Sequence, residues 1–390
     1  MVAYTHYRTD PRCRREAEAL AARGDAVDFV CLGDSSDAPV EIIQGVTVRR
    51  IKLRRYRGGS PANYLKSYAA FFLKAFGMVT RRTLRSRYDI IHVHSLPDQM
   101  VFVALIAKLL GTRVILDMHD LAPELYADRF GIAASSPFVR LLRLGERLSV
   151  GWSDRIVCVH DPQARHLAAR CRLGRPPCIV MNAPDPRLFK EGRTGVTRAE
   201  ERDPSHTYKI VHHGTLVQRY GADVAVRAFA EVKAAMPEAR FFIYGNGDFR
   251  PALEAEISGL RLGDSVYMSD GALPLDEMPS AISGASLGIV PHRDGPIMKW
   301  ALPTKMMEYM AMGIPVVVAR TEVIAEYFDD SMVMFFEPGN VSDLARCLLK
   351  LYREPELGRT LAHNAARFLE EHSWDREKLK LFALVDDLAS

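Results

Sequence analysis

The chain has 390 residues, a hydrophobic fraction of 48% and a net charge of +4, so it is long enough for two domains with sizeable cores. No apolar run approaches the ~20 residues of a membrane span, since the longest, Met100–Ala107, stops at Lys108. The first residues show no signal-peptide pattern, and the six scattered cysteines without CxxC spacing predict free thiols. We therefore expect a cytoplasmic globular protein without disulfides.

The charge is unevenly distributed along the chain. Residues 1–187 contain 29 Lys and Arg against 18 Asp and Glu, whereas residues 188–390 contain 23 against 30. The basic excess is concentrated in Arg49–Arg87, which has 12 basic residues, no acidic residue and interleaved aromatics such as Tyr64 and Phe72. This pattern predicts a surface for anionic lipid or another polyanion. A solvated basic helix face over an ordinary core stripe is the alternative.

In the first half of the chain, short apolar patterns typical of strands alternate with amphipathic patterns of helix length, which predicts a parallel sheet flanked by helices. The predicted strands are Val27–Leu32, Val46–Ile51, Ile90–His94, Val114–Asp117, Arg155–Val159 and Cys178–Met181. The predicted helices are Pro11–Ala22, Ala62–Leu84, Pro97–Leu110, Ser136–Val150 and Pro162–Ala169. A first strand would have to come from Met1–Tyr4, which barely supplies the ~5 residues of a typical strand.

A segment rich in Pro, Gly, Arg and Glu, Asp185–Thr207, predicts a linker followed by an exposed loop, after which the alternation restarts. The strands predicted there are Lys209–His213, Arg240–Tyr244, Val266–Ser269, Leu287–Val290, Val316–Ala319 and Met332–Phe335. The helices are Ala222–Ala235, Arg250–Leu260, Asp276–Ser283, Pro303–Met312, Val341–Arg353 and Pro355–Glu371. The predicted organisation is thus a domain at 1–184, a linker and loop at 185–207, a domain at 208–372 and a final helix at 373–390. That helix could stay with the second domain or cross back to the first.

Residues 302–318, LPTKMMEYMAMGIPVVV, combine a helix with a buried strand. Pro303 suits the first helical position and Gly313 suits the turn after the last one. The free N–H groups beside Thr304 and Lys305 would stabilise a phosphate, and Glu308 lies one turn further on the same helix face. A diphosphate at the helix start and a carboxylate for hydroxyls one turn later are what a nucleotide-sugar site needs. The alternative is an ordinary helix whose Glu is a solvated surface charge.

Three loops at the carboxyl ends of predicted strands precede this helix, at the edge where open α/β sheets bind ligands. The first loop begins at Gly214 and contains Arg219, whose guanidinium can bind phosphate oxygens in pairs. The third loop contains Asp270. The second loop has a glycine corner, where the backbone can approach a ligand closely or form a simple tight turn; it consists of Gly245, Asn246 and Gly247.

Two histidines in the first half are candidates for a site. His119 follows the predicted strand Val114–Asp117 and precedes Asp120, and His94 ends the neighbouring strand. His92 and His94 are two residues apart, so their side chains share one face of the strand. By residue type, His94, His119 and Asp120 could also bind zinc, although structural histidines are the plainer alternative.

These motifs resemble those of glycosyltransferase family 4, whose members are retaining enzymes of the GT-B fold. The signature helix of that family usually carries two glutamates separated by seven residues; Glu308 matches the second, and Trp300 stands in place of the first. The chain looks like a subset, common in bacterial polysaccharide synthesis, that has a Leu-Pro-Thr/Asn-Lys stretch and lacks the first acid. The resemblance extends to DPRCRREAEAL at 10–20, MHD at 118–120, NAPDPRLF at 182–189 and the loop of Arg219.

The resemblance implies an α/β fold of the GT-B type, with two Rossmann-like doubly wound parallel-sheet domains facing across a cleft. It implies catalytic roles for His119, Arg219 and Lys305, with Glu308 on the nucleotide ribose, and no metal or cofactor. Arg219 is displaced by one position from the family's basic residue, and Thr215 stands where another is common. The remaining residues that it implies bind the donor are Gly214, Thr215, Pro303, Thr304, Gly245, Asn246, Gly247, Asp270 and Asn182, and those on the acceptor side are His94 and Asp120.

Our interpretation of the sequence is a retaining glycosyltransferase that moves a sugar from a nucleoside diphosphate to an acceptor hydroxyl, in bacterial cell-surface polysaccharide or glycolipid synthesis. The acceptor would be lipid-linked, the protein peripheral on the inner face of the plasma membrane, and nucleic acid no partner. Three alternatives remain open: a glycosyltransferase acting on a small soluble natural product, a sugar-nucleotide epimerase of the same fold, and a non-catalytic nucleotide-sugar-binding protein.

Overall fold

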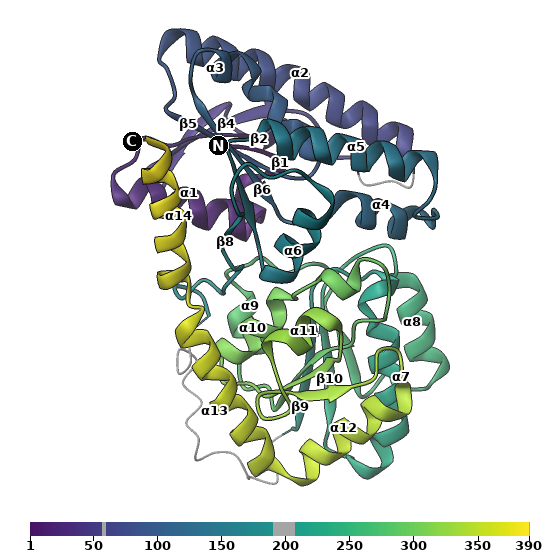
Figure 1. Ribbon diagram of the computed structural model, residues 1–390. Coiled ribbons are helices and arrows are strands. Elements are labelled where there is room, and N and C mark those ends of the chain that lie inside the picture. The colour runs from purple at the N-terminus through teal and green to yellow at the C-terminus, as the bar shows by residue number, and fades with distance from the viewer. Residues whose placement is uncertain (57–59, 190–206, 390) are drawn as a thin grey trace. The chain divides into compact units, whose positions relative to one another are not determined.

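The computed structural model describes residues 1–56, 60–189 and 207–389, and the chain divides into two compact units. Unit 1 comprises Met1–Asn182 with Asp375–Ser390, and unit 2 comprises Ala183–Trp374 (Figure 1). Residues 190–206, which contain most of the predicted exposed loop, lie outside the described residues, as do residues 57–59 of the basic stretch.

Unit 1 is built on one sheet with the strand order β3-β4-β2-β1-β5-β6-β7-β8, in which only the β3–β4 pair is antiparallel. The first strand runs to His6, so our expectation that it would be cut short at Tyr4 was wrong. The hairpin strand β3 was not predicted. The strands are β1 (Val2–His6), β2 (Asp28–Gly33), β3 (Val40–Ile43), β4 (Val46–Lys52), β5 (Ile90–His94), β6 (Arg113–Met118), β7 (Arg155–Cys158) and β8 (Cys178–Ile179).

The helices of unit 1 cover both faces of this sheet. The predicted helix Pro97–Leu110 was wrong in type: it is largely a 3-10 helix, η2 (Asp98–Ala104), followed by a short α-helix. This segment contacts both α2 and α5 and therefore has no solvent-facing polar stripe. The α-helices are α1 (Pro11–Arg23), α2 (Pro61–Arg85), α3 (Leu105–Leu109), α4 (Ala122–Phe130), α5 (Pro137–Trp152), α6 (Asp161–Arg170) and α14 (Trp374–Ala389).

The C-terminal helix α14 packs on unit 1. On its inner side the Glu377 carboxylate accepts a hydrogen bond from the backbone N–H of Met181 at 2.8 Å. Near its end, Asp386 pairs with Arg23 of α1 and Asp387 pairs with Arg155 of β7. The last residues of the chain thus lie beside elements from its first half (Figure 1).

Unit 2 has a fully parallel sheet with the order β11-β10-β9-β12-β13-β14. Its strands are β9 (Lys209–His213), β10 (Arg240–Tyr244), β11 (Val266–Met268), β12 (Leu287–Val290), β13 (Val316–Ala319) and β14 (Met334–Phe336). Its helices are η4 (Gln218–Tyr220), α7 (Ala222–Val232), η5 (Lys233–Ala235), α8 (Arg250–Gly259), α9 (Met278–Ile282), η6 (Met298–Trp300), α10 (Thr304–Ala311), α11 (Glu322–Tyr327), α12 (Val341–Arg353) and α13 (Pro355–Glu371).

Two parallel-sheet Rossmann-like domains are therefore present, as the sequence predicted. In both units the central strands are buried along their length, which is why they appear in the sequence as continuous apolar runs. Among the described residues, no helix is both long and apolar enough to cross a membrane.

Candidate functional site

Helix α10 begins at the carboxyl edge of the unit 2 sheet. Pro303 lies at the N-cap with extended backbone angles, so Thr304 is the first helical residue, one position later than predicted. Gly313, with φ +70°, follows the end of the helix as expected. Lys305 and Glu308 both lie on α10, and the Pro303 side chain is buried.

Lys305 is a buried lysine with no hydrogen-bond partner for its Nζ among the described residues. The ammonium lies against the loop after β9, so close that a Cβ at Gly214 would come within 3.0 Å of Nζ. It also lies 5.0 Å from the centre of the Tyr220 ring. Burial lowers the pKa of Lys305 to about 8, and the Glu308 carboxylate opposes that effect. A buried, unpaired ammonium is costly to the fold and suits an anion that arrives later.

Two buried histidines that the sequence analysis did not select surround this lysine. His212 holds its Nδ1 3.1 Å from the Ile289 carbonyl and leaves Nε2 unpaired, while His292 has no hydrogen-bond partner for either ring nitrogen. His292 stacks on Tyr220 with the ring centres 5.1 Å apart. Burial, followed by the charge of Lys305, holds the pKa of both histidines well below the usual value. Nε2 of His212, both ring nitrogens of His292 and Nζ of Lys305 thus form a group of buried nitrogens without hydrogen-bond partners among the described residues.

The pKa of Lys305 would make the binding of an anion beside its ammonium dependent on pH. The ammonium is present below about pH 8 and is lost as the pH rises above that value. Affinity for inorganic sulfate, whose own charge does not change in this range, should therefore be nearly constant below pH 7 and fall as the pH rises from 8 to 9.5, by up to about tenfold per pH unit. Titration calorimetry across this range checks the prediction, and an affinity that stays flat to pH 9.5 would remove Lys305 from the anion site.

Glu308 is held in place by a contact with the end of β9. Its Oε2 lies 3.2 Å from Nε2 of His213, whose backbone N–H donates a hydrogen bond to the Tyr309 hydroxyl at 3.1 Å. Tyr309 is buried and its hydroxyl donates in turn to the Val211 carbonyl. The Glu308 side chain is 14% exposed, so the carboxylate is fixed yet open to a ligand hydroxyl.

Arg219 lies on η4, in the loop that leaves β9. Its guanidinium is 5.2 Å from the centre of the Tyr220 ring, and its charge contributes to the low pKa of His292. Its backbone carbonyl accepts a hydrogen bond from the N–H of Arg293, which ties this loop to the end of β12. Thr215, in the same loop, is exposed. Arg219 and Lys305 thus both lie beside the Tyr220 ring, and the predicted contact of Arg219 with a diphosphate stays a prediction.

The glycine corner after β10 has a packing role. A Cβ at Gly245 would come within 1.9 Å of the Gly214 carbonyl oxygen, and one at Gly247 within 2.2 Å of the Leu216 carbonyl oxygen. The glycines therefore let two loops pack backbone against backbone. Asn246 and Asp270 are exposed at the same edge, and whether they and the glycines contact a donor stays a prediction.

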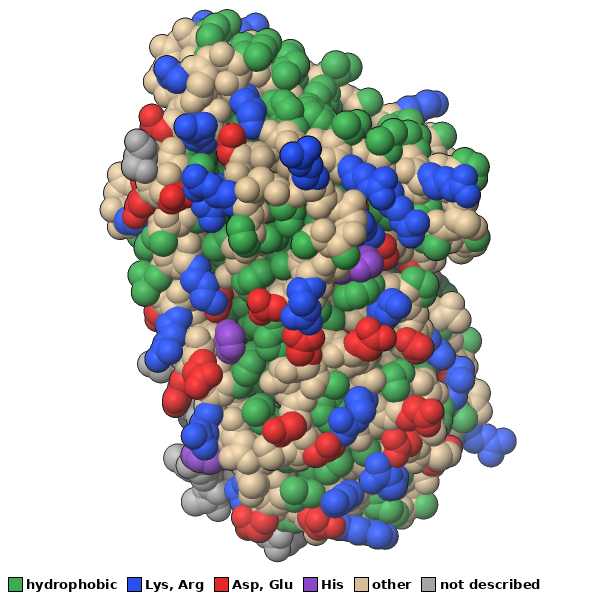
Figure 2. All heavy atoms as spheres, viewed as in Figure 1, with side chains coloured by type: hydrophobic (Ala, Val, Ile, Leu, Met, Phe, Trp, Pro, Cys, Tyr) green, Lys and Arg blue, Asp and Glu red, His purple; other side chains and the backbone are tan. Residues whose placement is uncertain are grey.

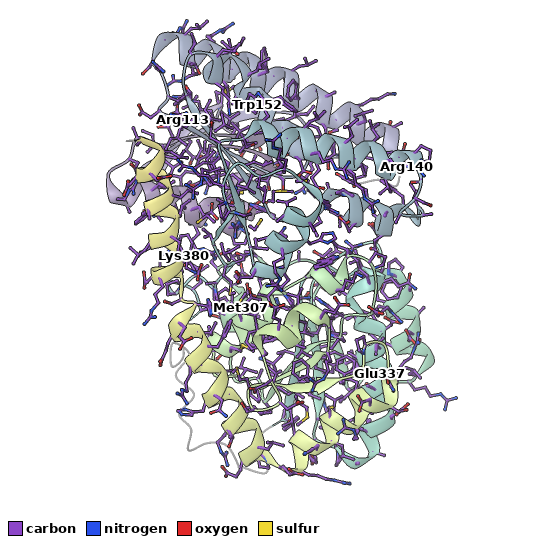
Figure 3. All side chains as sticks on the ribbon, in the orientation of Figure 1. Arg113, Arg140, Trp152, Met307, Glu337 and Lys380 are labelled. Carbon is purple, nitrogen blue, oxygen red and sulfur yellow. The ribbon has the colours of Figure 1, made fainter. Side chains whose placement is uncertain are left out.

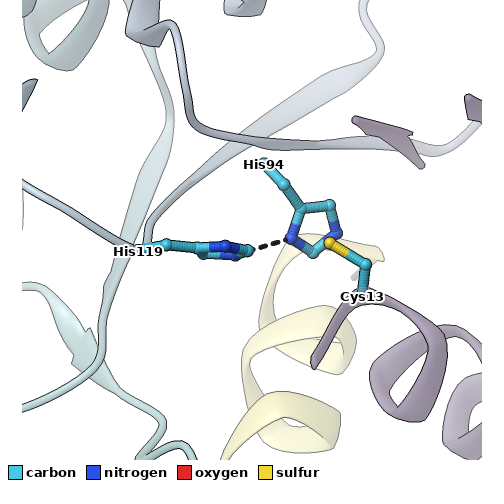
Figure 4. A group of neighbouring side chains, drawn as sticks. All are labelled: Cys13, His94 and His119. Carbon is cyan, nitrogen blue, oxygen red and sulfur yellow. Dashed lines mark hydrogen bonds between the residues drawn. The ribbon is translucent and has the colours of Figure 1, made fainter. Parts of the chain in front are cut away.

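In unit 1, His94 and His119 belong to a network around the buried carboxylate of Asp117. Arg12 donates two hydrogen bonds to this carboxylate, at 2.9 and 3.1 Å. One carboxylate oxygen lies 3.2 Å from Nδ1 of His94 and 3.4 Å from Nε2 of His119. The two rings are themselves in contact, with Nδ1 of His94 3.1 Å from Nε2 of His119 (Figure 4).

The network gives the two histidines opposite protonation tendencies. Burial lowers the pKa of His94 to about 3, so His94 is neutral. For His119, burial acts in the same direction, but the Asp117 carboxylate outweighs it and raises the pKa. His94 is 1% exposed and His119 20% exposed in its side chain. Within unit 1, His119 is therefore the ring that can meet a ligand, and His94 supports it from beneath.

The other two predicted residues of this unit differ in exposure. Asp120 is exposed beside His119. Asn182 is half-buried, and its Oδ1 accepts a hydrogen bond from Arg15 at 2.8 Å. Arg15 of α1 therefore orients the Asn182 amide.

A different trio from the predicted zinc ligands comes together here. Side-chain donors of Cys13, His94 and His119 lie within 4.8 Å of one another, as Figure 4 shows, whereas Asp120 belongs to none of the groups of this kind found among the described residues. A metal would need the Cys13 thiolate. Burial, with nearby carboxylates, raises the pKa of that thiol well above its usual value. The chemistry of this donor set therefore disfavours a metal.

Two family models match the chain in succession. Residues 9–182 match the glycosyl transferase 4-like domain, and residues 207–354 match the glycosyl transferases group 1 domain. Together with the two Rossmann-like domains, these matches define a glycosyltransferase of the GT-B fold. The chain belongs to the glycosyltransferases with this pair of domains, in the group of family 4.

Relatives of known sequence are also glycosyltransferases. A D-inositol 3-phosphate glycosyltransferase from Kribbella flavida is 27% identical over 91% of this chain and 85% of its own length. A sulfoquinovosyl transferase from Arabidopsis thaliana is 25% identical over 76% of this chain, a match that spans 56% of that protein.

Solved structures share the fold at low sequence identity. A sucrose-phosphate synthase from Thermosynechococcus elongatus superposes with a TM-score of 0.78 at 19% identity, covering 99% of this chain and 98% of that one. HepE from Anabaena, in complex with UDP-glucose, superposes with a TM-score of 0.71 at 14% identity and covers 99% of both chains.

Proposed function

We propose that this glycosyltransferase transfers a sugar from a nucleoside diphosphate to an acceptor hydroxyl with retention of the anomeric configuration. The observation that carries the proposal is the group of buried nitrogens around Lys305, at the start of α10, that have no hydrogen-bond partner among the described residues. A diphosphate would supply an anionic partner for them. HepE, a structural neighbour, was solved with UDP and with UDP-glucose, which supports a nucleotide-sugar donor for this chain.

The proposed reaction follows from which side chains the site contains and which it lacks. Trp300 stands at the position of the family's first glutamate, which leaves no carboxylate nucleophile there. The proposed reaction is therefore a same-face substitution: the bond from the anomeric carbon to the diphosphate oxygen breaks as the acceptor oxygen bonds to that carbon. The acceptor proton passes to the departing diphosphate. Arg219, Lys305 and the N-terminus of α10 stabilise the charge that develops on the diphosphate.

Glu308 is proposed to bind the nucleotide ribose. A carboxylate accepts hydrogen bonds from two vicinal hydroxyls, and losing a charged acceptor costs ~1.5–3 kcal/mol. Glu308→Ala should therefore weaken donor binding by roughly ten- to a hundredfold, while its melting temperature stays close to that of the parent. Glu322→Ala, which removes a carboxylate elsewhere in unit 2, is the control. Calorimetry with the preferred nucleoside diphosphate decides the matter, and an unchanged affinity in Glu308→Ala would exclude the ribose role.

The proposed reaction uses cationic side chains and a helix N-terminus in place of a metal. Turnover should therefore persist in excess EDTA and show no rise with added Mg²⁺ or Mn²⁺. Rates measured before and after dialysis against the chelator test this expectation. Activity that disappears with EDTA and returns with a divalent cation would contradict the proposed diphosphate site.

We also propose that the acceptor is lipid-linked and that the enzyme works in cell-surface polysaccharide or glycolipid synthesis, peripheral on the inner face of the plasma membrane. The basic stretch Arg49–Arg87 supports an anionic membrane surface as partner. The name of one relative, a phosphatidylinositol N-acetylglucosaminyltransferase subunit from Arabidopsis thaliana, points to a lipid acceptor for that protein. A small soluble acceptor is the second candidate, and a non-catalytic nucleotide-sugar-binding protein is the third.

A panel of nucleotide sugars separates these candidates. We expect one base to bind preferentially, and the matching donor to be consumed when extracted lipids are added. Consumption with water-soluble acceptors alone would favour the soluble natural product. Tight binding of a donor that is never hydrolysed or transferred would favour the non-catalytic binding protein.

A further inference from the structure

Unit 1 exposes an unusual number of leucines on three helices. The described residues include fourteen exposed large hydrophobic side chains, and nine of them are leucines on or directly after α2, α3 and α5. Single exposed leucines are normal at protein surfaces, whereas a group on neighbouring helices calls for a partner. They are Leu65, Leu73 and Leu84 of α2; Leu105, Leu109 and Leu110 at α3; and Leu141, Leu144 and Leu148 of α5.

Helix α5 shows the pattern most clearly. Its buried stripe includes Val139 and Val150, so an ordinary surface helix would be polar on the opposite side. Instead, Leu141, Leu144 and Leu148, at intervals of three and four residues, are 51–64% exposed. The solvent side of α5 is thus a second apolar stripe.

Basic residues accompany these leucines, and exposed acids do not. Arg140 and Arg147 of α5 are exposed next to Leu141 and Leu148 in the sequence, and Arg143 is half-exposed. The one acidic residue of α5, Glu146, is fully buried and bound to Arg170 at 2.6 Å. Helices α2 and α3 contain no Asp or Glu at all, and α2 exposes Lys66, Lys74, Arg81 and Arg85.

The three helices form one side of unit 1. η2 contacts both α2 and α5 and continues directly into α3, and residues of all of them share one core on the same face of the sheet. Figure 1 shows α2, α3 and α5 together, and Figure 3 labels Arg140 and Trp152 toward opposite ends of α5. In Figure 2, hydrophobic and basic side chains lie interspersed over this part of unit 1. We call the exposed leucines and basic residues of α2, α3 and α5 the leucine–arginine surface.

We propose that the leucine–arginine surface docks on an anionic lipid bilayer, with the leucines of α5 and α3 entering the interface and the basic residues meeting lipid phosphates. Charge and chemistry select this occupant. A second copy of the same surface would bring like charges together, and a nucleic acid would leave the leucines without apolar partners. An anionic bilayer satisfies both groups at once.

This inference rests on the proposed function only for its purpose, which is to bring the enzyme to a lipid-linked acceptor. It goes beyond the basic stretch Arg49–Arg87, because it adds α5 and α3 and an apolar contribution. Attraction by charge alone disappears in high salt, whereas buried leucines are insensitive to it. Binding should therefore weaken in 0.5 M salt without vanishing.

Vesicle sedimentation with matched variants tests the proposal. The full chain is mixed with phosphatidylcholine vesicles that contain or lack phosphatidylglycerol. The triple variant Leu141→Gln, Leu144→Gln, Leu148→Gln keeps helix propensity. Its control, Ile42→Thr with Leu379→Gln, removes two exposed hydrophobics of similar exposure from β3 and α14. Nucleoside diphosphate binding is measured for every variant without vesicles. It reports on folding and on the donor site independently of membrane binding.

The parent and the control should bind phosphatidylglycerol vesicles equally, and the triple variant should lose affinity by more than about tenfold while keeping diphosphate binding. Arg140→Gln with Arg147→Gln should reduce binding mainly at low salt. In Leu144→Trp, vesicles should shift the added fluorescence to shorter wavelength. Equal vesicle binding by parent and triple variant would overturn the proposal. A parent protein that does not bind the vesicles would also overturn it, even if its exposed leucines form a dimer interface in solution.

Discussion

Lys305→Met should lower kcat/KM by about 10²–10³-fold, the loss expected when one preorganised charge at a transition-state oxyanion is removed. The ammonium has no hydrogen-bond partner among the described residues, so its removal breaks no internal hydrogen bond. Affinity for the nucleoside diphosphate should fall as well, because this product is the leaving group that the ammonium stabilises. The same substitution should raise the melting temperature, since an unpaired buried ammonium destabilises the folded state.

Lys209→Met provides the matched control. Lys209 is also in unit 2 and burial also lowers its pKa, but its ammonium donates hydrogen bonds to the carbonyls of Ala281 and Ser283. This variant should lose stability and keep diphosphate affinity. If Lys305→Met instead lost stability and retained full activity, Lys305 would be a structural residue and the diphosphate site would lie elsewhere.

His119→Ala should lower turnover by about 10²–10³-fold, within the range for groups that act directly on the reacting centre, and leave nucleoside diphosphate affinity nearly unchanged. The reason is that His119 belongs to unit 1, whereas the proposed ribose and diphosphate contacts belong to unit 2. The Asp117 carboxylate raises the pKa of this ring, so the activity that depends on protonated His119 should decline as the pH rises through that pKa.

His363→Ala, at an exposed position of α13, is the control for a surface histidine. Steady-state kinetics and calorimetry on both variants separate the two steps. A parallel loss of turnover and diphosphate affinity in His119→Ala would assign His119 to the support of the fold. His94→Gln, in contrast, should show this parallel loss, because His94 lies buried beneath His119.

The strands of both sheets were predictable because their residues form unbroken apolar runs. β12 and β13 begin and end where the sequence indicated. The edge strand β3 was missed because it leaves Val40 and Ile42 exposed and so lacks a burial pattern. The segment after Pro97 was assigned to an α-helix because its run of apolar residues shows no period that distinguishes an α-helix from a 3-10 helix.

The sequence identified Lys305 by its place at a helix start and His119 by its place after a strand. It identified Glu308 one turn further along the same helix and Arg219 in the loop after β9, and the roles of all four stay predictions. His212 was missed because it lies inside the apolar run of β9, where it looks like a core residue. His212 becomes a candidate residue only because it lies near Lys305. His292 follows β12 by two residues, and this position at the carboxyl edge of the sheet was a signal that could have found it.

Proton NMR of a turnover reaction is the sharpest test of retaining transfer from a nucleotide sugar. The preferred α-linked donor is incubated with enzyme and acceptor, and the anomeric signal of the first product is followed as it forms. We expect an α-linked product at the earliest time points, in the presence of EDTA. A β-linked product, or a bound donor that remains intact, would contradict it.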